Sequence, residues 1–266
     1  MAIHRRTSHD DFGQGPEIRI AGAIRSSKSI GIEVNNDQTR SHRAKSQPTT
    51  REEERWLEPT FFIDWKSSPV LEFSRRETAG ATSNRERAIR LFYAVRDGFR
   101  YDPYSVSRHA EDYRASAIAQ TSRAFCGPKA IFLTAVARAA GVPARIGFAD
   151  VRNHLATPKL LERMGTDIFV FHGYCELYIE GQWLKVAPTF NRELCERFGV
   201  KTQEFDGRAD ALLQPFDAEG RRHMEYVNDR GIFDDVPFEE MMRVFEEIYG
   251  PGIADLSKES DPAFQT

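Results

Sequence analysis

Hydrophobic positions recur with helical spacing in two stretches of the chain. Residues 85–97 place apolar side chains on one face of a predicted helix, with Asn84 as its expected cap: Ala88, Leu91, Phe92 and Val95. A second helix is predicted from about Gly127 to Ala140. Pro128 suits a first helical turn, and Gly141 follows the last helical residue.

Strand-like patterns follow this second helix. We expect strands at Ala144–Val151, Phe169–Ile179 and Gln182–Ala187. Only Glu180 and Gly181 separate the last two, so the sequence predicts a tight hairpin. Helices mixed with antiparallel strands indicate an α+β fold.

The hairpin can be interpreted face by face, because successive side chains of a strand point to opposite sides. One face is apolar and contains Phe169, Phe171, Cys175, Leu177 and Ile179. The other is amphipathic and contains Val170, His172, Tyr174, Glu176 and Tyr178. A two-residue turn would place Glu176 opposite Lys185 and His172 opposite Thr189. His172 is therefore expected on the side away from the main core.

Two further helices are predicted towards the end of the chain. The first covers Glu193–Phe198, and the second covers Phe238–Tyr249. The second helix has a core-facing stripe at helical spacing, formed by Met241, Met242, Phe245 and Ile248. The segment between the two helices is rich in charge, glycine and turn residues and is expected to be loop.

Composition changes near residue 50. The first fifty residues hold 8 Lys+Arg, 5 Asp+Glu and only 13 hydrophobic residues, too few to offset chain entropy. We therefore expect residues 1–50 to be a polar, disordered N-terminal extension and residues 51–266 to form the folded domain. The start of the chain lacks the apolar segment of a signal peptide, so a cytoplasmic protein is expected.

Charge and cysteine content exclude several classes of protein. The 266 residues carry a net charge of -3 without a dominant basic block, so nucleic acid is not expected as a partner. Apolar runs are too short to span a membrane. Three cysteines are too few for a disulfide framework, and no acidic or Cys/His spacing indicates a metal or another cofactor.

Cys126 has the most informative position of the three cysteines. It stands directly before the predicted helix, where unpaired backbone N–H groups favour an anion, so a lowered thiol pKa is expected. The same amides can stabilise the oxyanion formed when a thiolate attacks a carbonyl. His172 would serve as base and acid if the helix packs across the sheet. A buried packing role for both residues is the alternative.

A family resemblance strengthens the catalytic interpretation. The segments SRAFCGPKAIFLTAVARAAGVPARIGFADV and FHGYCELYIEGQWLKVAPTFN resemble the transglutaminase-like superfamily over roughly residues 85–191. That resemblance rests on Cys126 opening a helix, on the exit Gly141-Val142-Pro143-Ala144-Arg145, and on His172 before Trp183. It implies a papain-like fold and a Cys126 nucleophile with a His172 base.

The sequence departs from the family at its third catalytic residue. The resemblance places an Asp at position 187, but this chain has alanine there, which cannot orient an imidazole. Asn191 is the first candidate to replace it, by analogy with the Cys, His, Asn set of papain-like proteases, followed by Thr189 and Glu176. Alternatively, a dyad suffices for an easy reaction, or the domain has lost catalysis and binds a partner.

The leading prediction is therefore cysteine-dependent acyl transfer with a thioester intermediate. The expected substrate is a peptide, a protein or a small amide, and hydrolysis is favoured over protein cross-linking. The competing prediction is a catalytically impaired domain that acts as a binding module. The pattern leaves the exact substrate and the oligomeric state open.

Overall fold

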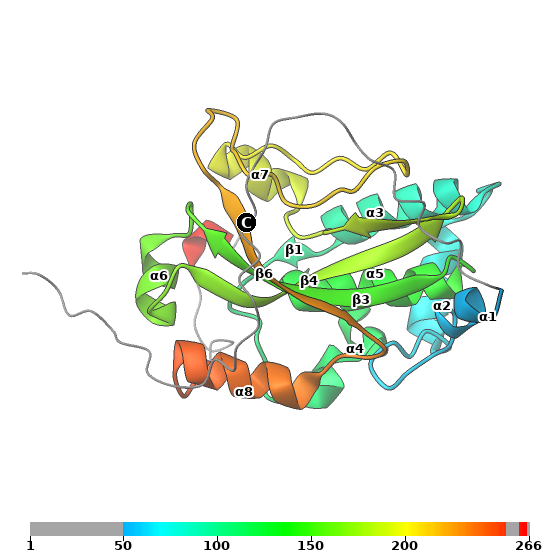
Figure 1. The fold of residues 1–266 in the computed structure, drawn as a ribbon, viewed down its shortest axis with the longest axis horizontal. Coiled ribbons are helices and arrows are strands. Elements are labelled where there is room, and N and C mark those ends of the chain that lie inside the picture. Colours follow the sequence, from blue (N-terminus) through cyan, green and yellow to red (C-terminus); the bar gives the residue numbers. More distant parts are fainter. Residues whose placement is uncertain (1–49, 254–260, 265–266) are drawn as a thin grey trace, which may run out of the picture. The chain divides into compact units, whose positions relative to one another are not determined.

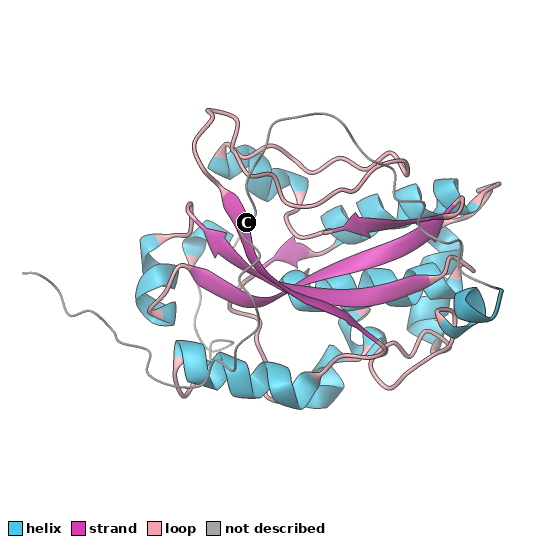
Figure 2. Cartoon of the chain, in the orientation of Figure 1, coloured by secondary structure: helices cyan, strands magenta, loops and turns pink. Residues whose placement is uncertain are grey.

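The computed structural model describes residues 50–253 and 261–264 (Figure 1). The predicted N-terminal extension, residues 1–50, lies outside the described residues except for its last position. Figure 2 shows a twisted sheet flanked by helices, so the described part has the predicted α+β class.

The main sheet has four strands in the order β5-β4-β3-β6, and each strand is antiparallel to its neighbours. The strands are β3 (Ala144–Asn153), β4 (Ile168–Ile179), β5 (Gln182–Val186) and β6 (Met224–Phe233). A separate pair of short parallel strands, β1 (Arg100–Tyr101) and β2 (Arg123–Ala124), lies just before the central helix. The strands β3, β4 and β5 confirm the three that the alternation predicts.

Helices surround this sheet. They are α1 (Thr50–Arg55), α2 (Ser68–Glu77), α3 (Asn84–Gly98), α4 (Ala115–Ile118), α5 (Cys126–Ala139), α6 (Pro158–Met164), α7 (Arg192–Phe198) and α8 (Phe238–Tyr249), with short 3₁₀ turns at Ala110–Tyr113 and Pro262–Phe264. Residues Cys126–Arg138 of α5 are all buried, because this helix packs against β4 on one side and against α2 and α3 on others. Figure 1 shows α5 behind β3 and β4, at the centre of the domain.

The first predicted helix begins one residue earlier than expected. Ser83, not Asn84, is the N-cap of α3, and its side chain accepts a hydrogen bond from the Glu86 backbone N–H at 3.1 Å. The Glu86 carboxylate in turn accepts a hydrogen bond from the Thr82 N–H at 2.9 Å. Serine followed by glutamate three residues later is the usual sequence signature of a helix start, and here it outweighs the asparagine.

The predicted hairpin register is confirmed. Tyr178 pairs with Trp183 and Glu176 with Lys185 across β4 and β5. Glu180 and Gly181 both have positive φ, 48° and 85°, as a two-residue turn of type I′ requires.

The ladder ends at the pair Cys175–Val186. The next backbone N–H, that of Ala187, donates to the Ala211 carbonyl at 2.9 Å instead. His172 and Thr189, which were predicted to lie opposite each other, therefore do not form a pair of this ladder.

Phe171 interrupts the predicted alternation of β4. Its φ of 54° lies in the left-handed region, which a phenylalanine rarely adopts. As a result, Val170 and Phe171 both belong to the main core instead of lying on opposite faces. His172, the next residue, faces away from that core, as predicted, but is itself 2% exposed.

β6 is the largest element that the pattern misses. Its middle, around Asn228, is polar and exposed, so the segment looks like loop in the sequence. It forms a strand because it pairs with β3, with Met224 opposite Asn153 and Phe233 opposite Ile146.

The stripe predicted for α8 is correct at two positions and wrong at another. Met241 and Phe245 are buried, whereas Ile248 is 46% exposed and Val244 is buried in its place.

Candidate active site

Cys126 is the first residue of α5, and β4 crosses the helix at this end. A side chain at Gly173 would place its Cβ 2.9 Å from the Gly127 Cα and 3.1 Å from the Cys126 carbonyl oxygen. The absence of a side chain at Gly173 therefore allows direct contact between strand and helix. His172 precedes Gly173, so the fold brings the predicted base to the end of α5 that holds the predicted nucleophile.

Strands β3 and β6 complete the surroundings of His172. Ala149 is its partner across the β3–β4 ladder, and the Tyr226 ring of β6 lies edge-on to the imidazole with 5.9 Å between the ring centroids. Tyr226 is a neighbour that the sequence does not reveal, because it depends on a strand that the pattern misses. These aromatic and aliphatic neighbours keep the imidazole in an apolar environment.

Burial sets the protonation state of Cys126. The pKa of the thiol is raised to about 11 by desolvation, so the predicted lowering of this pKa is wrong for this conformation. Backbone N–H groups of Gly173, Gly127 and Cys126 itself act in the opposite direction. The amides of Cys126 and Gly127 are those expected at the helix start, and the Gly173 amide comes from β4, but together they do not outweigh the loss of water around the sulfur.

The same desolvation keeps His172 neutral. Its pKa is lowered to about 4, because the charged imidazolium would lose its hydration. The Nε2 atom is buried and has no hydrogen-bond partner among the described residues. Burial therefore favours the neutral form of both the thiol and the imidazole, and one ring nitrogen of the imidazole is unsatisfied among the described residues.

Neither position 187 nor the candidates Thr189 and Glu176 supplies a hydrogen-bond acceptor to His172. Ala187 is fully buried in an apolar cluster that also contains Ala149, Val151, Tyr174, Leu213 and Met224. The Thr189 hydroxyl is buried with no partner among the described residues. Glu176 instead accepts a hydrogen bond from Arg145 at 2.7 Å, and its carboxylate lies 3.9 Å from the Lys185 ammonium.

Asn191 stands at the beginning of α7 and uses both of its polar atoms there. Its Oδ1 accepts a hydrogen bond from the Tyr101 backbone N–H at 3.0 Å, and its Nδ2 donates to Glu193 at 2.8 Å. The structure therefore brings Asn191 to β1 and not to the imidazole nitrogen that lacks a partner. In this conformation, Asn191 positions Tyr101.

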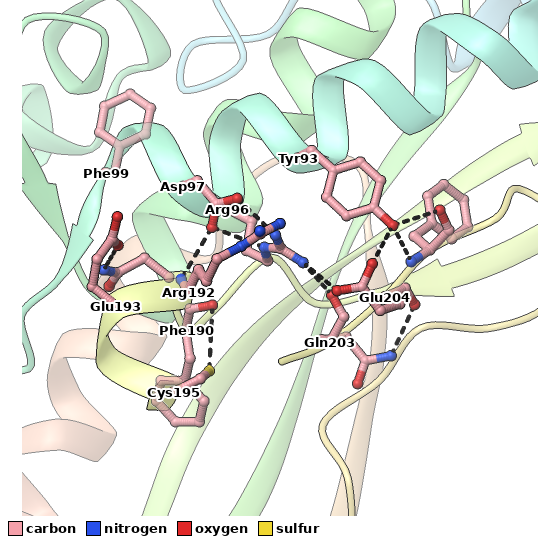
Figure 3. A network of polar contacts seen from close by, with 12 residues as sticks. Tyr93, Arg96, Asp97, Phe99, Phe190, Arg192, Glu193, Cys195, Gln203 and Glu204 are labelled. Carbon is pink, nitrogen blue, oxygen red and sulfur yellow. Dashed lines mark hydrogen bonds and ion pairs between the residues drawn. The ribbon is translucent and has the colours of Figure 1, made fainter. Parts of the chain in front are cut away.

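A polar network attaches this part of the chain to α3 (Figure 3). The Asp97 carboxylate accepts hydrogen bonds from the Arg96 side chain at 2.6 and 2.9 Å and from the Arg192 backbone N–H at 3.1 Å. The fully buried Arg96 also donates to the Gln203 carbonyl at 2.6 Å. These contacts fix the start of α7 and therefore the position of Asn191.

A second polar cluster next to His172 was not predicted. Asp150 accepts hydrogen bonds from the Phe171 backbone N–H at 3.1 Å, from Arg230 at 2.6 Å and from Asn228 at 3.0 Å. The first of these hydrogen bonds holds the backbone of Phe171, the residue with positive φ. Asp150 thereby fixes the backbone from which His172 extends, while its charge is balanced by Arg230.

An apolar pocket opens beside the Cys126 sulfur, and we call it the Cys126 pocket. Its aromatic lining consists of Tyr101, Phe125, Phe169, Phe245 and Tyr249. Its other lining residues, besides Cys126, are Pro103, Val106, Met164, Val170 and Ile253. Cys126 as a whole residue is 8% exposed, while Cys175 and Cys195 are more deeply buried.

His223 is buried against Phe190, with 5.8 Å between the stacked rings, although its sequence neighbours are polar. His109 and His154 are exposed. No group of three or more His, Cys, Asp or Glu in the described ranges is arranged to hold a metal ion. Within the same ranges, no helix combines the length and the apolar character needed to cross a membrane.

A protein-family model matches part of the chain. Residues 72–188 match the family model of the transglutaminase-like superfamily. These residues form a transglutaminase-like domain. The matched region contains both Cys126 and His172 but ends before α7 and α8.

Two solved structures are similar to parts of the chain. A putative cysteine protease from Cytophaga hutchinsonii shares 18% identity and a TM-score of 0.39, covering 50% of this chain and 40% of its own. A putative protease from Parabacteroides distasonis shares 15% identity and a TM-score of 0.33, covering 55% of this chain and 30% of its own. The chain thus spans less than half of either structure. A search of curated proteins finds no significant match.

The raised thiol pKa predicts how Cys126 alkylation depends on pH. Only the thiolate reacts, so the rate with iodoacetamide is expected to rise about tenfold per pH unit from pH 7 towards a pKa near 11. Quench-flow or timed mass spectrometry of the Cys126 peptide measures this rate. A plateau already present between pH 5 and 7 would instead indicate a preformed thiolate–imidazolium pair.

The lowered His172 pKa predicts a loss of stability in acid. The unfolded state binds the proton at about pH 6.5 and the folded state only near pH 4, so stability falls as pH decreases through this window. The loss from this group is about 3 kcal/mol. In urea titrations, His172→Gln should reduce the pH-dependent loss in the free energy of unfolding by about 3 kcal/mol. His109 is exposed, so the control variant His109→Gln should keep the full pH-dependent loss in the free energy of unfolding.

Proposed function

We propose that the protein is a cysteine-dependent hydrolase of amide or peptide bonds. The observation that carries the proposal is the direct packing of β4 on α5, which brings His172 to the helix end that begins with Cys126. The match to the transglutaminase-like superfamily over residues 72–188 supports the same chemistry at family level.

In the proposed reaction, the neutral imidazole removes the thiol proton as the sulfur attacks the substrate carbonyl. A carbon–sulfur bond forms, and the protonated His172 then gives its proton to the leaving amine as the carbon–nitrogen bond breaks. Backbone N–H groups near Cys126 stabilise the oxyanion. Water then hydrolyses the thioester, with His172 again acting as base.

Concerted proton transfer suits this site better than a resting ion pair. Burial opposes the charge of both residues, since it raises the thiol pKa and lowers the imidazole pKa. A substrate that is bound next to the sulfur supplies the electrophile towards which negative charge moves. The dyad therefore becomes charged only as the bond to the substrate forms.

Selective alkylation tests this proposal. Iodoacetamide at pH 8 should modify Cys126 at least tenfold faster than Cys175 or Cys195, because Cys126 is the most exposed of the three cysteines. Peptide mapping by mass spectrometry gives the three rates from one reaction. Equal, slow modification of all three thiols would contradict a role for Cys126 as nucleophile.

A binding module is the second candidate function. The specific observation in its favour is the unsatisfied Nε2 atom of His172, together with the alanine at position 187. An imidazole without an orienting acceptor loses about 10⁴-fold in turnover in serine proteases. If the domain only binds, Cys126→Ala should leave the capture of its partner unchanged and no thiol-dependent hydrolysis should be measurable in the unaltered protein.

A further inference from the structure

The Cys126 pocket also indicates what kind of acyl group the site accepts. Apart from the Cys126 thiol, its polar groups among the described lining residues are the hydroxyls of Tyr101 and Tyr249, and none of these lining residues is charged. Tyr249 Oη accepts a hydrogen bond from the Val170 backbone N–H at 2.6 Å. A charged or strongly hydrated substituent would therefore lose water here without finding adequate partners.

The walls of the pocket are held in place by packing. Tyr249 joins the end of α8 to β4 through its bond to Val170, and Phe245 packs on Tyr249 with 5.6 Å between ring centroids. On the opposite side, the bond from the Tyr101 N–H to Asn191 fixes β1. These contacts hold the lining residues Tyr249, Phe245 and Tyr101 in place.

We propose that the Cys126 pocket receives an apolar aliphatic or aromatic substituent adjacent to the reacting carbonyl of the acyl donor. This inference rests on the proposed function, since the pocket matters for catalysis only if Cys126 is acylated. Most of the pocket lining, including Val106 and Met164, lies within the matched family region, whereas α8 and Ile253 contribute lining from outside it. Substrate preference would therefore be set jointly by the family core, which also carries the nucleophile, and by the α8 addition to that core.

A series of p-nitrophenyl esters tests the inference without knowledge of the natural substrate. In each case the Cys126 sulfur forms a bond to the acyl carbon, p-nitrophenolate leaves, and the thiol proton passes through His172 to solvent. The rate of acylation is followed by p-nitrophenolate release and by mass mapping of acylated Cys126. Cys126→Ala supplies the background rate.

We expect the acylation rate to increase at least tenfold from the acetyl to the hexanoyl ester, since each buried methylene favours binding. A succinyl ester, which ends in a carboxylate, should react at least tenfold more slowly than the butyryl ester. Equal rates across the series, or a preference for the succinyl ester, would overturn the inference. If no ester acylates Cys126, the proposed function fails instead, so the two failures are distinguishable.

Matched valine variants connect the preference to the pocket. Val106→Phe fills the pocket and should reduce hexanoyl transfer about tenfold while changing acetyl transfer less than twofold. Val227→Phe introduces the same side chain on β6 at a position that is 42% exposed, and it should change neither rate.

Because Val106 is buried, a thermal unfolding curve must accompany Val106→Phe. Should that variant unfold, Met164→Ala provides a second test by enlarging the pocket. It should move the optimum towards longer or aromatic acyl groups. An unchanged chain-length profile in a folded Val106→Phe or Met164→Ala variant would contradict the assignment of this pocket.

Discussion

Cys126→Ala is expected to reduce thiol-dependent hydrolysis of p-nitrophenyl hexanoate to the rate in buffer, a loss of about 10³-fold or more. Removal of a nucleophile in a coupled catalytic set eliminates the covalent step, and what remains reflects binding alone. The side chain is small and lines a pocket, so the variant should remain folded. Initial rates with the purified protein and matched thermal unfolding curves give the comparison.

Cys195→Ala is the control for a general thiol effect. This cysteine is buried in α7, where its sulfur lies 4.0 Å from the Phe190 carbonyl oxygen, and its variant should keep the rate within about threefold of the unaltered protein. A Cys126→Ala variant that retains most of the hydrolysis would rule out Cys126 as the nucleophile.

Gly173→Ala is expected to have the largest effect on stability, with a loss of about 3 kcal/mol in the free energy of unfolding. The new methyl group would lie 2.9 Å from the Gly127 Cα and 3.1 Å from the Cys126 carbonyl oxygen. These neighbours are backbone atoms, which cannot move aside as a flexible side chain does. Strand and helix must separate, which also increases the distance between His172 and Cys126.

Gly98→Ala is the matched control, because a Cβ at the end of α3 meets no atom within 4 Å. Its free energy of unfolding should change by less than about 1 kcal/mol. Urea titrations of both variants, combined with the rate of Cys126 alkylation, separate loss of stability from loss of site geometry. Equal stabilities of the two variants would mean that β4 does not rest on α5 as described.

The local parts of the fold were accessible from the sequence. The hairpin of β4 and β5 was predicted in register because alternation and a two-residue turn act within fewer than twenty residues. The start of α5 followed from Pro128 and the adjoining apolar run. Each of these elements depends on neighbours along the chain, so the local sequence pattern is sufficient to predict it.

Elements that depend on distant partners were not accessible. β6 has a polar middle and becomes a strand only by pairing with β3, whose residues lie 71 (Asn153 and Met224) to 87 (Ile146 and Phe233) positions earlier in the chain. Because β6 was not predicted, neither were the position of Tyr226 beside His172 and the contact of Arg230 with Asp150. Asp150 in turn accepts a hydrogen bond from the backbone N–H of Phe171, the residue with positive φ.

The helix and the strand that carry Cys126 and His172 were predicted, but the electrostatics of these residues were not. Cys126 and His172 occupy the expected elements, yet the thiol pKa shifts in the opposite direction to that predicted. A helix start favours the thiolate, whereas burial opposes it, and burial is a property of the folded chain that no local motif reports. Likewise, the Asn191 side chain could orient an imidazole, but its Oδ1 accepts from the Tyr101 N–H and its Nδ2 donates to Glu193.

The most direct test of the account is to trap the acyl-enzyme. After brief mixing with p-nitrophenyl hexanoate, peptide mapping should find the hexanoyl group on Cys126, and the adduct should be released by hydroxylamine as a thioester is. His172→Ala should slow the formation of this adduct at least a hundredfold. Acylation of Cys175, Cys195 or lysine side chains at the same rate as Cys126, or no adduct on Cys126 at all, would contradict the account.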